Sequence, residues 1–448
     1  MVRANSLPIL AAMLLGASLL SADQGSSRLR QSSQMEAPKQ AGFDRAGLQA
    51  LDREFEGAVA RGEVPGLTYL LVRHGKVAAF KSFGQAVPAK GLAQNNDTIV
   101  RIFSMTKPIT GTAMMMLYDQ GKWKLDDPIT KFLPEMANLR VLNGVDANGN
   151  PITVPVNRPP TMRELMSHTA GFGYGLMPGN AVDDIFRAKA VTGSKDLSAV
   201  SAKVATIPLK FQPGEGWSYS IATDLQARIV EVISGQKFSD FLQQRIFVPL
   251  GMKDTGFYVP ADKVGRFAEL YGLNPADGKL VPIPPGFAPQ LGNFTGPNRQ
   301  QSGGGGLVST AADYGKFCQM ILNGGRLGGV RLLRKETVDL MGRDVIPAGV
   351  QPDNGLVTAM GTTAFRFGPG VGFGLDFMVV KDPKLASLPV GKGTLSWGGA
   401  AGTWFWIDPE NDLYFIGMIQ RLGGSRGMQD LPGISQRLAY QSLKKPGK

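Results

Sequence analysis

Three serines in the sequence stand three residues before a lysine, a spacing that suits a serine nucleophile with a lysine base. On a helix, residues i and i+3 share a face, so the amine lies beside the hydroxyl. Burial and neighbouring positive groups can lower the pKa of such a lysine until it accepts a proton near neutrality. The pairs are Ser104/Lys107, Ser234/Lys237 and Ser442/Lys445. Ser234 ends a predicted helix and Ser442 lies in the C-terminal tail, so we interpret both of these pairs as solvated surface pairs.

Ser104 is distinguished by its neighbours. The short apolar segment 100–103 leads into it, and segment 110–118 after it is an almost wholly apolar helix, which suits a buried position. Ser104 would then stand at a helix N-terminus, where free backbone N–H groups can stabilise an oxyanion. Pro108 falls in the first turns, where it is tolerated. The same pattern is equally compatible with a serine that only caps a buried helix.

Composition disfavours a Ser-His-Asp triad and a metal site. The one Gly-x-Ser-x-Gly is centred on Ser425, but the hydrolase fold places its histidine later in the chain, and no histidine follows His168. The other histidine, His74, stands in a predicted exposed turn. The single cysteine, Cys318, excludes an intramolecular disulfide and a Cys-cluster metal site. Two histidines are too few for a His-rich metal site.

Two further segments have the residue types of an acyl-transfer site. The loop 213–220 precedes a predicted helix over 223–233 and can deliver the Tyr219 hydroxyl to a cleft. A phenol beside a lysine can act as a base. The small residues of segment 393–402 allow a ligand or another backbone to approach a strand edge closely. Taken singly, a core tyrosine and tight sheet packing account for these two patterns as well.

The elements expected to position these residues are strands at both ends of the chain. Apolar residues three and four positions apart predict a helix over 44–60. Segments 67–72 and 77–80 follow as strands joined by a short turn. Near the other end, 403–407 and 413–418 form a second hairpin pattern. The simplest arrangement is one sheet built from both ends.

The middle of the chain, from about 105 to 345, consists mostly of helical segments and loops rich in glycine and proline. It is therefore interpreted as a helical insertion between the two parts of the sheet. The glycine run 303–306 is interpreted as a loop rather than a phosphate-binding loop, because no Gly-Lys-Ser or Gly-Lys-Thr follows it.

Length and composition are those of a large globular protein. The chain has 448 residues, 43% hydrophobic and 19% charged, which excludes wholesale disorder and a polytopic membrane protein. The net charge of +12 is scattered, so neither nucleic-acid binding nor stable membrane insertion is expected. Residues 1–22 look like a secretory signal and 23–41 like a polar linker, so we expect a periplasmic or secreted protein. If Met35 is the true start, the protein is cytoplasmic.

Taken together and in order, these segments resemble the serine β-lactamase and penicillin-binding-protein superfamily, specifically the branch of class C β-lactamases and family VIII carboxylesterases. The resemblance covers almost everything from Gly42 onward. The segments that carry it are 104–108, 165–171, 213–220, 304–313 and 397–399. Any one of them is unspecific, but all of them in family order are highly specific.

The resemblance implies an α+β fold of the β-lactamase and transpeptidase type. An antiparallel sheet flanked by helices would be built from about 42–120 and 345–448, and a mostly helical part would cover about 121–344. No metal or organic cofactor is implied.

The resemblance also implies a role for each site residue. Ser104 would be the acylated nucleophile, with Lys107 and Tyr219 sharing the work of general base as a coupled pair. The backbone N–H groups of Ser104 and Ala400 would form the oxyanion hole. His168 would help to shape the loop beside the cleft.

Two departures from the β-lactamase branch bear on the substrate. Ile221 stands where that branch has the Asn of Tyr-x-Asn, and Trp397 stands where it has Lys or His. A buried polar contact left unmade costs about 1–3 kcal/mol, and an indole offers an apolar wall instead. With Gly398 and Gly399, these two residues are the predicted substrate-binding set.

The sequence therefore predicts a carboxylesterase that acts on small-molecule esters with short to medium acyl chains, with weak promiscuous β-lactam hydrolysis. The alternatives are a class C-like β-lactamase or D-amino-acid peptidase, and a non-catalytic module that binds β-lactams or cell wall.

Overall fold

The computed structural model describes residues 38–176, 179–284, 294–297, 300–352, 366–423 and 428–444, all within one compact unit, Met35–Lys448. The predicted signal segment 1–22 and the linker up to residue 37 lie outside the described residues. The end of the predicted linker forms the short 3₁₀ helix η1 (Pro38–Ala41). Among the described helices, none combines the length and the hydropathy needed to cross a membrane.

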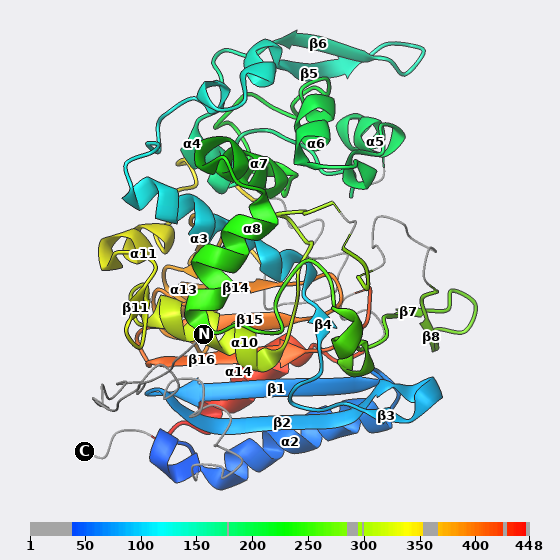
Figure 1. Ribbon diagram of the computed structural model, residues 1–448, viewed down its shortest axis with the longest axis vertical. Helices are drawn as coiled ribbons and strands as arrows, with labels where there is room; N and C mark the ends of the chain where they lie inside the picture. Colours follow the sequence, from blue (N-terminus) through cyan, green and yellow to red (C-terminus); the bar gives the residue numbers. More distant parts are fainter. Residues whose placement is uncertain are drawn as a thin grey trace, which may run out of the picture. The chain divides into compact units, whose positions relative to one another are not determined.

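An eight-stranded sheet joins the two ends of the chain (Figure 1). All of its strand pairs are antiparallel, and β1 lies between β16 and β2, with Leu71 opposite Phe415. The prediction of one sheet built from N- and C-terminal segments is confirmed. In the order in which they lie side by side, the strands are β12 (Val371–Phe373), β13 (Met378–Val380), β14 (Leu395–Gly398), β15 (Trp404–Asp408), β16 (Leu413–Met418), β1 (Gly66–Arg73), β2 (Lys76–Val87) and β3 (Leu92–Ala93).

Most of the described helices come between the two parts of the sheet in the sequence, as predicted. The described α-helices are α2 (Arg45–Ala60), α3 (Thr106–Asp119), α4 (Met162–Met166), α5 (Ala181–Ala188), α6 (Leu197–Val204), α7 (Ala222–Ser234), α8 (Phe238–Leu242), α9 (Val248–Leu250), α10 (Ala311–Leu322), α11 (Lys335–Met341), α13 (Pro383–Ala386) and α14 (Leu431–Gln441), of which α3 to α11 come between the two parts of the sheet. Two-stranded ladders join β4 (Val100–Arg101) to β9 (Val308–Ser309), β5 (Arg140–Val145) to β6 (Pro151–Pro155), β7 (Tyr271–Leu273) to β8 (Leu280–Pro282), and β10 (Arg326–Leu327) to β11 (Val330–Arg331).

Helices cover both faces of the sheet. Successive side chains of a strand point to opposite faces, so neighbouring residues of β15 contact different helices. On β15, the Trp404 ring packs against Phe55 of α2, and its indole N–H donates to Ser435 of α14. The next residue, Phe405, packs against Tyr314 of α10. Helix α10 lies within 121–344, the range predicted for the helical part, yet it packs against the sheet. The boundary between the two parts therefore comes before α10 rather than at the predicted residue 345.

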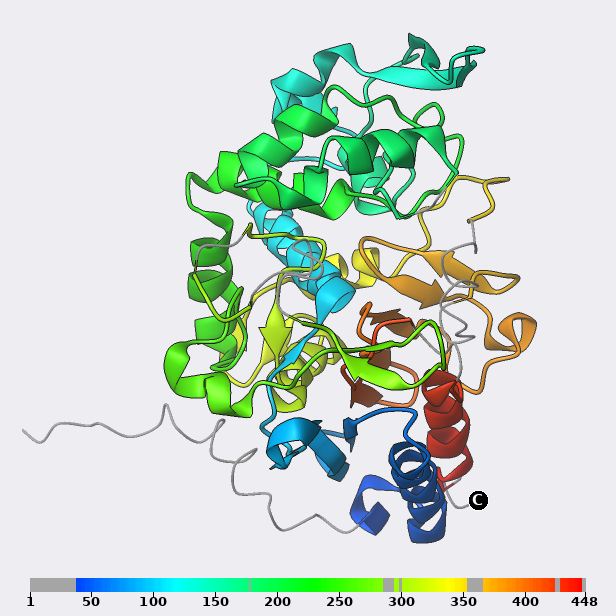
Figure 2. The same ribbon diagram turned by 90° about the vertical axis from the view of Figure 1, so that its right-hand side faces the viewer.

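Helix α3 lies between the sheet and the helical part (Figure 2). Every residue from Thr106 to Leu117 is buried, as the scarcity of charged residues in this segment predicts. The short ladder β4–β9 brings the glycine-rich segment before β9 alongside the start of the helix, where the Leu307 amide donates to Thr106 Oγ1 at 3.2 Å. The core thus holds the first turn of α3 against segments from distant parts of the chain.

Candidate active site

Ser104 lies in the 3₁₀ turn η3 (Phe103–Met105), directly before α3. Its Oγ accepts hydrogen bonds from Lys107 Nζ at 3.2 Å and from the Tyr219 hydroxyl at 2.7 Å. No side chain caps the start of α3, so Ser104 is not a helix cap. The preceding Phe103 has a φ of 40°, a strained conformation of the kind that clusters at functional sites. The three residues predicted to share the chemistry are thus brought together.

Lys107 is a buried cationic side chain, with an exposed fraction of 1%. Besides its bond to Ser104, its Nζ donates to the carbonyl of Gly304 at 2.7 Å and to the Tyr174 hydroxyl at 3.5 Å. It also lies 4.5 Å from the centre of the Tyr219 ring. These contacts hold the amine at one position between the nucleophile and the predicted second base.

The loop that carries Tyr219 is held by His168. The His168 carbonyl accepts from the Ser218 amide at 3.0 Å, and its Nδ1 lies 2.9 Å from Ser220 Oγ. Its ring lies 5.1 Å from that of Tyr219. Burial, and then the charge of Lys107, lower the pKa of His168 well below its usual value, so the ring is neutral. These contacts fit the predicted role of His168 in shaping the loop.

The third predicted segment packs beside the nucleophile. Strand β14 contacts η3, and a Cβ built on Gly399 would lie 2.3 Å from the Ile102 carbonyl oxygen. Gly398 ends β14 opposite Trp404. Ala400 is exposed, and its amide makes no hydrogen bond within the described part of the chain. The predicted oxyanion-hole role of the Ser104 and Ala400 amides stays a prediction.

An aromatic wall adjoins the site, defined here as Trp217, Tyr219, Phe367, Phe373 and Trp397. The Trp397 and Tyr219 rings are 5.5 Å apart, and Phe373 lies 5.4 Å from Trp397. Trp217 stacks along Tyr219 at 6.5 Å and contacts Phe367 at 4.8 Å. One side of the site is therefore apolar and uncharged.

The predicted substrate-binding residue Ile221 is buried. It immediately precedes α7 and has an exposed fraction of 1%. Its contact with substrate stays a prediction.

Three residues beside Lys107 were not singled out by sequence reasoning as site residues: Tyr174, Asp224 and Gly304. Burial, and then Asp224, raise the pKa of Tyr174 well above its usual value, so the phenol stays protonated. Asp224 belongs to the first turn of α7 and has an exposed fraction of 1%. Helical spacing places Asp224 on the same face as Arg228 and Glu231, so nothing in the sequence signals that it is buried.

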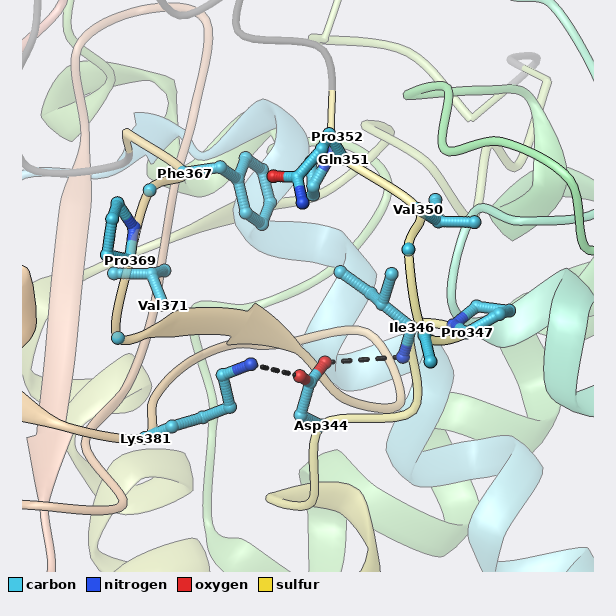
Figure 3. Close-up of a pocket in the computed structure, with 14 residues that line it drawn as sticks. Asp344, Ile346, Pro347, Val350, Gln351, Pro352, Phe367, Pro369, Val371 and Lys381 are labelled. Atoms are coloured by element: carbon cyan, nitrogen blue, oxygen red, sulfur yellow. Dashed lines mark hydrogen bonds and ion pairs between the residues drawn. The ribbon is translucent and has the colours of Figure 1, made fainter.

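A pocket adjoins the aromatic wall at Phe367 (Figure 3). It has a volume of about 360 Å³, and Phe367 belongs both to its lining and to the wall. At one end, Lys381 donates to Asp344 at 2.5 Å. None of the three predicted catalytic residues lines it.

The other candidates lie away from this centre. Ser234 ends α7 and bonds the Val230 carbonyl, and Lys237 is exposed, as predicted for a surface pair. Ser442 is buried rather than solvated, and its hydroxyl donates to the Ala439 carbonyl. Lys445 and Ser425 lie outside the described residues. His74 is exposed in the β1–β2 turn, as predicted. Within the described ranges, no cluster of His, Cys, Asp and Glu is arranged to hold a metal ion.

A family model described as Beta-lactamase matches residues 51–437. Protein Rv1367c of Mycobacterium tuberculosis (strain ATCC 25618 / H37Rv) is 36% identical over 386 residues, which cover 84% of this chain and 89% of that protein. Esterase EstB of Burkholderia gladioli is 31% identical over 383 residues, which cover 81% of this chain and 88% of EstB.

Among solved structures, this chain is similar to EstCE1, described as a hydrolase with promiscuous acyltransferase activity. The two share 24% sequence identity, with a TM-score of 0.71 over 90% of this chain and 99% of the other. The range matched by the family model, 51–437, includes Ser104, Lys107, Tyr219 and Trp397.

Proposed function

The chain belongs to the Beta-lactamase family and is a serine hydrolase of the esterase and acyltransferase type, and from this we propose that it is a carboxylesterase acting on short to medium acyl esters. The observation that carries the proposal is the convergence of Lys107 Nζ and the Tyr219 hydroxyl on Ser104 Oγ beside the uncharged Trp397. The first two contacts supply an activated nucleophile, and the third favours an uncharged substrate.

In the proposed reaction, Ser104 Oγ attacks the ester carbonyl while the Lys107/Tyr219 pair takes its proton. The amides of Ser104 and Ala400 stabilise the oxyanion. The tetrahedral intermediate expels the alcohol, which leaves with the proton held by the pair, and an acyl-enzyme remains. Water then attacks the acyl carbonyl, the pair accepts its proton and returns it to Ser104, and the carboxylic acid departs. Side chains, backbone amides and water supply every group that acts on the ester in this sequence.

The aromatic wall supports a neutral, apolar substrate. Discrimination between substrates is a difference in transition-state binding. The indole of Trp397 provides no positive charge for the carboxylate of a β-lactam, but it can bury part of an acyl or alcohol group. We therefore propose efficient ester hydrolysis with at most weak β-lactam hydrolysis.

The test is steady-state turnover of p-nitrophenyl esters of graded chain length, compared with nitrocefin on the same preparation. Ser104→Ala should abolish ester turnover, whereas Ser234→Ala, the surface member of the same sequence pattern, should retain it. Higher kcat/KM for nitrocefin than for every ester would replace the proposal with a β-lactamase. A stable acyl adduct without turnover would indicate a binding module.

A further inference from the structure

A second group of polar side chains surrounds Lys107, in addition to Ser104 and Tyr219. An ideal Cβ placed on Gly304 would lie 2.5 Å from the Tyr174 hydroxyl, 2.6 Å from Asp224 Oδ2 and 3.5 Å from Lys107 Nζ. Three ionisable groups from separate segments therefore meet at one glycine. The carbonyl of the same glycine accepts a hydrogen bond from Lys107. The absence of a side chain at residue 304 is what makes room for this cluster.

Asp224 is a buried acid without a conventional partner. Within the described residues, neither of its carboxylate oxygens makes a hydrogen bond of ordinary geometry. Burial raises the pKa of Asp224, while the nearby Ser302 hydroxyl, the charge of Lys107 and the Gly304 amide act in the opposite direction. A buried carboxylate is expensive unless a positive charge compensates it. Lys107 is the cation at this location.

A second buried acid, Asp376, provides a contrast. Its Oδ1 accepts a hydrogen bond from Gln226 Nε2 at 3.1 Å. Its Oδ2 faces α3 at Gly111, where a Cβ would lie 2.6 Å away. Burial raises its pKa well above the usual value despite Gln226 and Lys107, so this side chain is held protonated. Burial thus raises the pKa of both acids, and of the two it is Asp224 that lies with Lys107 at Gly304.

We propose that the Asp224 carboxylate is the buried counter-charge of Lys107 and acts through it as a positioning residue, directing the ammonium toward Ser104 Oγ. This inference rests on the proposed ester hydrolysis. In the resting enzyme, Ser104 Oγ, the Gly304 carbonyl and Asp224 surround the Lys107 amine. Without the carboxylate, the negative charge beside the amine is lost, and the amine is held less firmly toward Ser104.

The first test replaces each of the two acids in turn by asparagine, which has nearly the same shape but no charge, in the full-length enzyme. Asp224→Asn should lower kcat for p-nitrophenyl butyrate on the order of 10²-fold, because small displacements of a catalytic group have effects of that size. KM should change little, since Asp224 does not line the aromatic wall. Asp376→Asn should stay close to wild type, because it replaces an acid that is already uncharged. Asp224→Ser, a smaller neutral side chain, repeats the comparison if the asparagine variant does not fold.

The second test is the pH profile of kcat/KM. The titratable groups that face Lys107 are Asp224, Asp376, His168, Tyr174 and Tyr219. Removing a negative charge makes neighbouring groups release protons more easily. The acidic limb of the profile should therefore move to lower pH in Asp224→Asn and stay in place in Asp376→Asn. A purely structural role for Asp224 would lower activity without moving the limb.

A serine-directed fluorophosphonate separates this inference from the proposed function. Slow labelling of Asp224→Asn, with wild-type labelling of Asp376→Asn, supports Asp224 as the counter-charge even if no ester is turned over. Rapid wild-type labelling without ester turnover contradicts only the proposed function. Equal labelling rates for the two variants, or slow labelling with an unmoved pH limb, would overturn the role of Asp224.

Discussion

At the scale of single residues, the burial of Lys107 sets the chemistry of the site. A buried ammonium is costly without partners, and those of Lys107 include the nucleophile Ser104 and the face of the Tyr219 ring. Because Tyr219 bonds the same Ser104 oxygen, the amine and the phenol share one proton-transfer task. Substitutions at these two residues should consequently not act independently.

Lys107→Ala and Tyr219→Phe should each lower kcat by about 10²–10⁴-fold, because proton transfer in the transition state is worth that much. The double variant should lose much less than the product of the two single losses, as residues acting as a unit do. Steady-state kinetics on p-nitrophenyl butyrate measures all three. Lys237→Ala, the exposed lysine of a surface pair, is the control. Strictly multiplicative losses would mean that the two groups act separately.

We expect Trp397 to decide which substrates the site accepts. Trp397→Lys should raise the ratio of nitrocefin to p-nitrophenyl butyrate turnover, mainly through a lower KM for the anionic substrate, because it adds a charge that attracts a carboxylate. Trp397→Ala is the control, since it removes the apolar ring without adding a charge. An unchanged ratio in the lysine variant would show that this position does not select the substrate.

At the scale of elements, strand β14 and the turn η3 must approach closely for the site to form. A Cβ on Gly399 would lie 2.3 Å from the Ile102 carbonyl oxygen and 2.4 Å from Thr403 Oγ1. Because Ile102 directly precedes the η3 turn that carries Ser104, we expect this glycine to set the spacing between Ser104 and the Ala400 amide.

Gly399→Ala should therefore lower kcat on the order of 10²-fold, the size of effect expected from moving an oxyanion donor. Kinetics together with thermal unfolding separates this local displacement from loss of the fold. Gly329→Ala is the matched control, because its Cβ would meet nothing within 4 Å. Wild-type kcat in Gly399→Ala would show that the β14 edge takes no part in catalysis.

At the scale of the whole molecule, the first and last strand-forming segments share one sheet. Thr68 pairs with Met418 and Arg73 with Leu413, so both ends of the folded unit are needed to complete the core. The predicted leader precedes this unit in the sequence and contributes no residue to the described sheet. Its removal should therefore leave the site intact.

Export of the protein tests whether the leader is separate from the folded unit. Expression with the native leader should yield a mature chain that begins near Asp23 and retains full esterase activity, because the cut precedes the first described residue. Mass spectrometry of the periplasmic or secreted fraction determines the start. An intact chain, or one initiated at Met35 and confined to the cytoplasm, would contradict the prediction.

The sequence by itself determined the local features of the site and the class of fold. Spacing placed Ser104 and Lys107 one helical turn apart, and the scarcity of charged residues after them predicted the burial of α3. Apolar runs separated by short turns at both ends predicted the strands of one sheet. These are short-range properties, because side-chain periodicity is set by the geometry of a single element.

Only the tertiary structure decided which distant groups surround Lys107. The Tyr219 loop was a recognisable segment, but its hydroxyl reaches Ser104 across 115 residues of chain, and the Gly304 carbonyl reaches Lys107 across 197. Asp224 and Tyr174 carry no local pattern that marks them as neighbours of a lysine. Their positions follow from the packing of α7 against α3 and from the space left by a glycine. Those distances depend on the whole core at once, since close-packed interiors fix each segment through all of its neighbours.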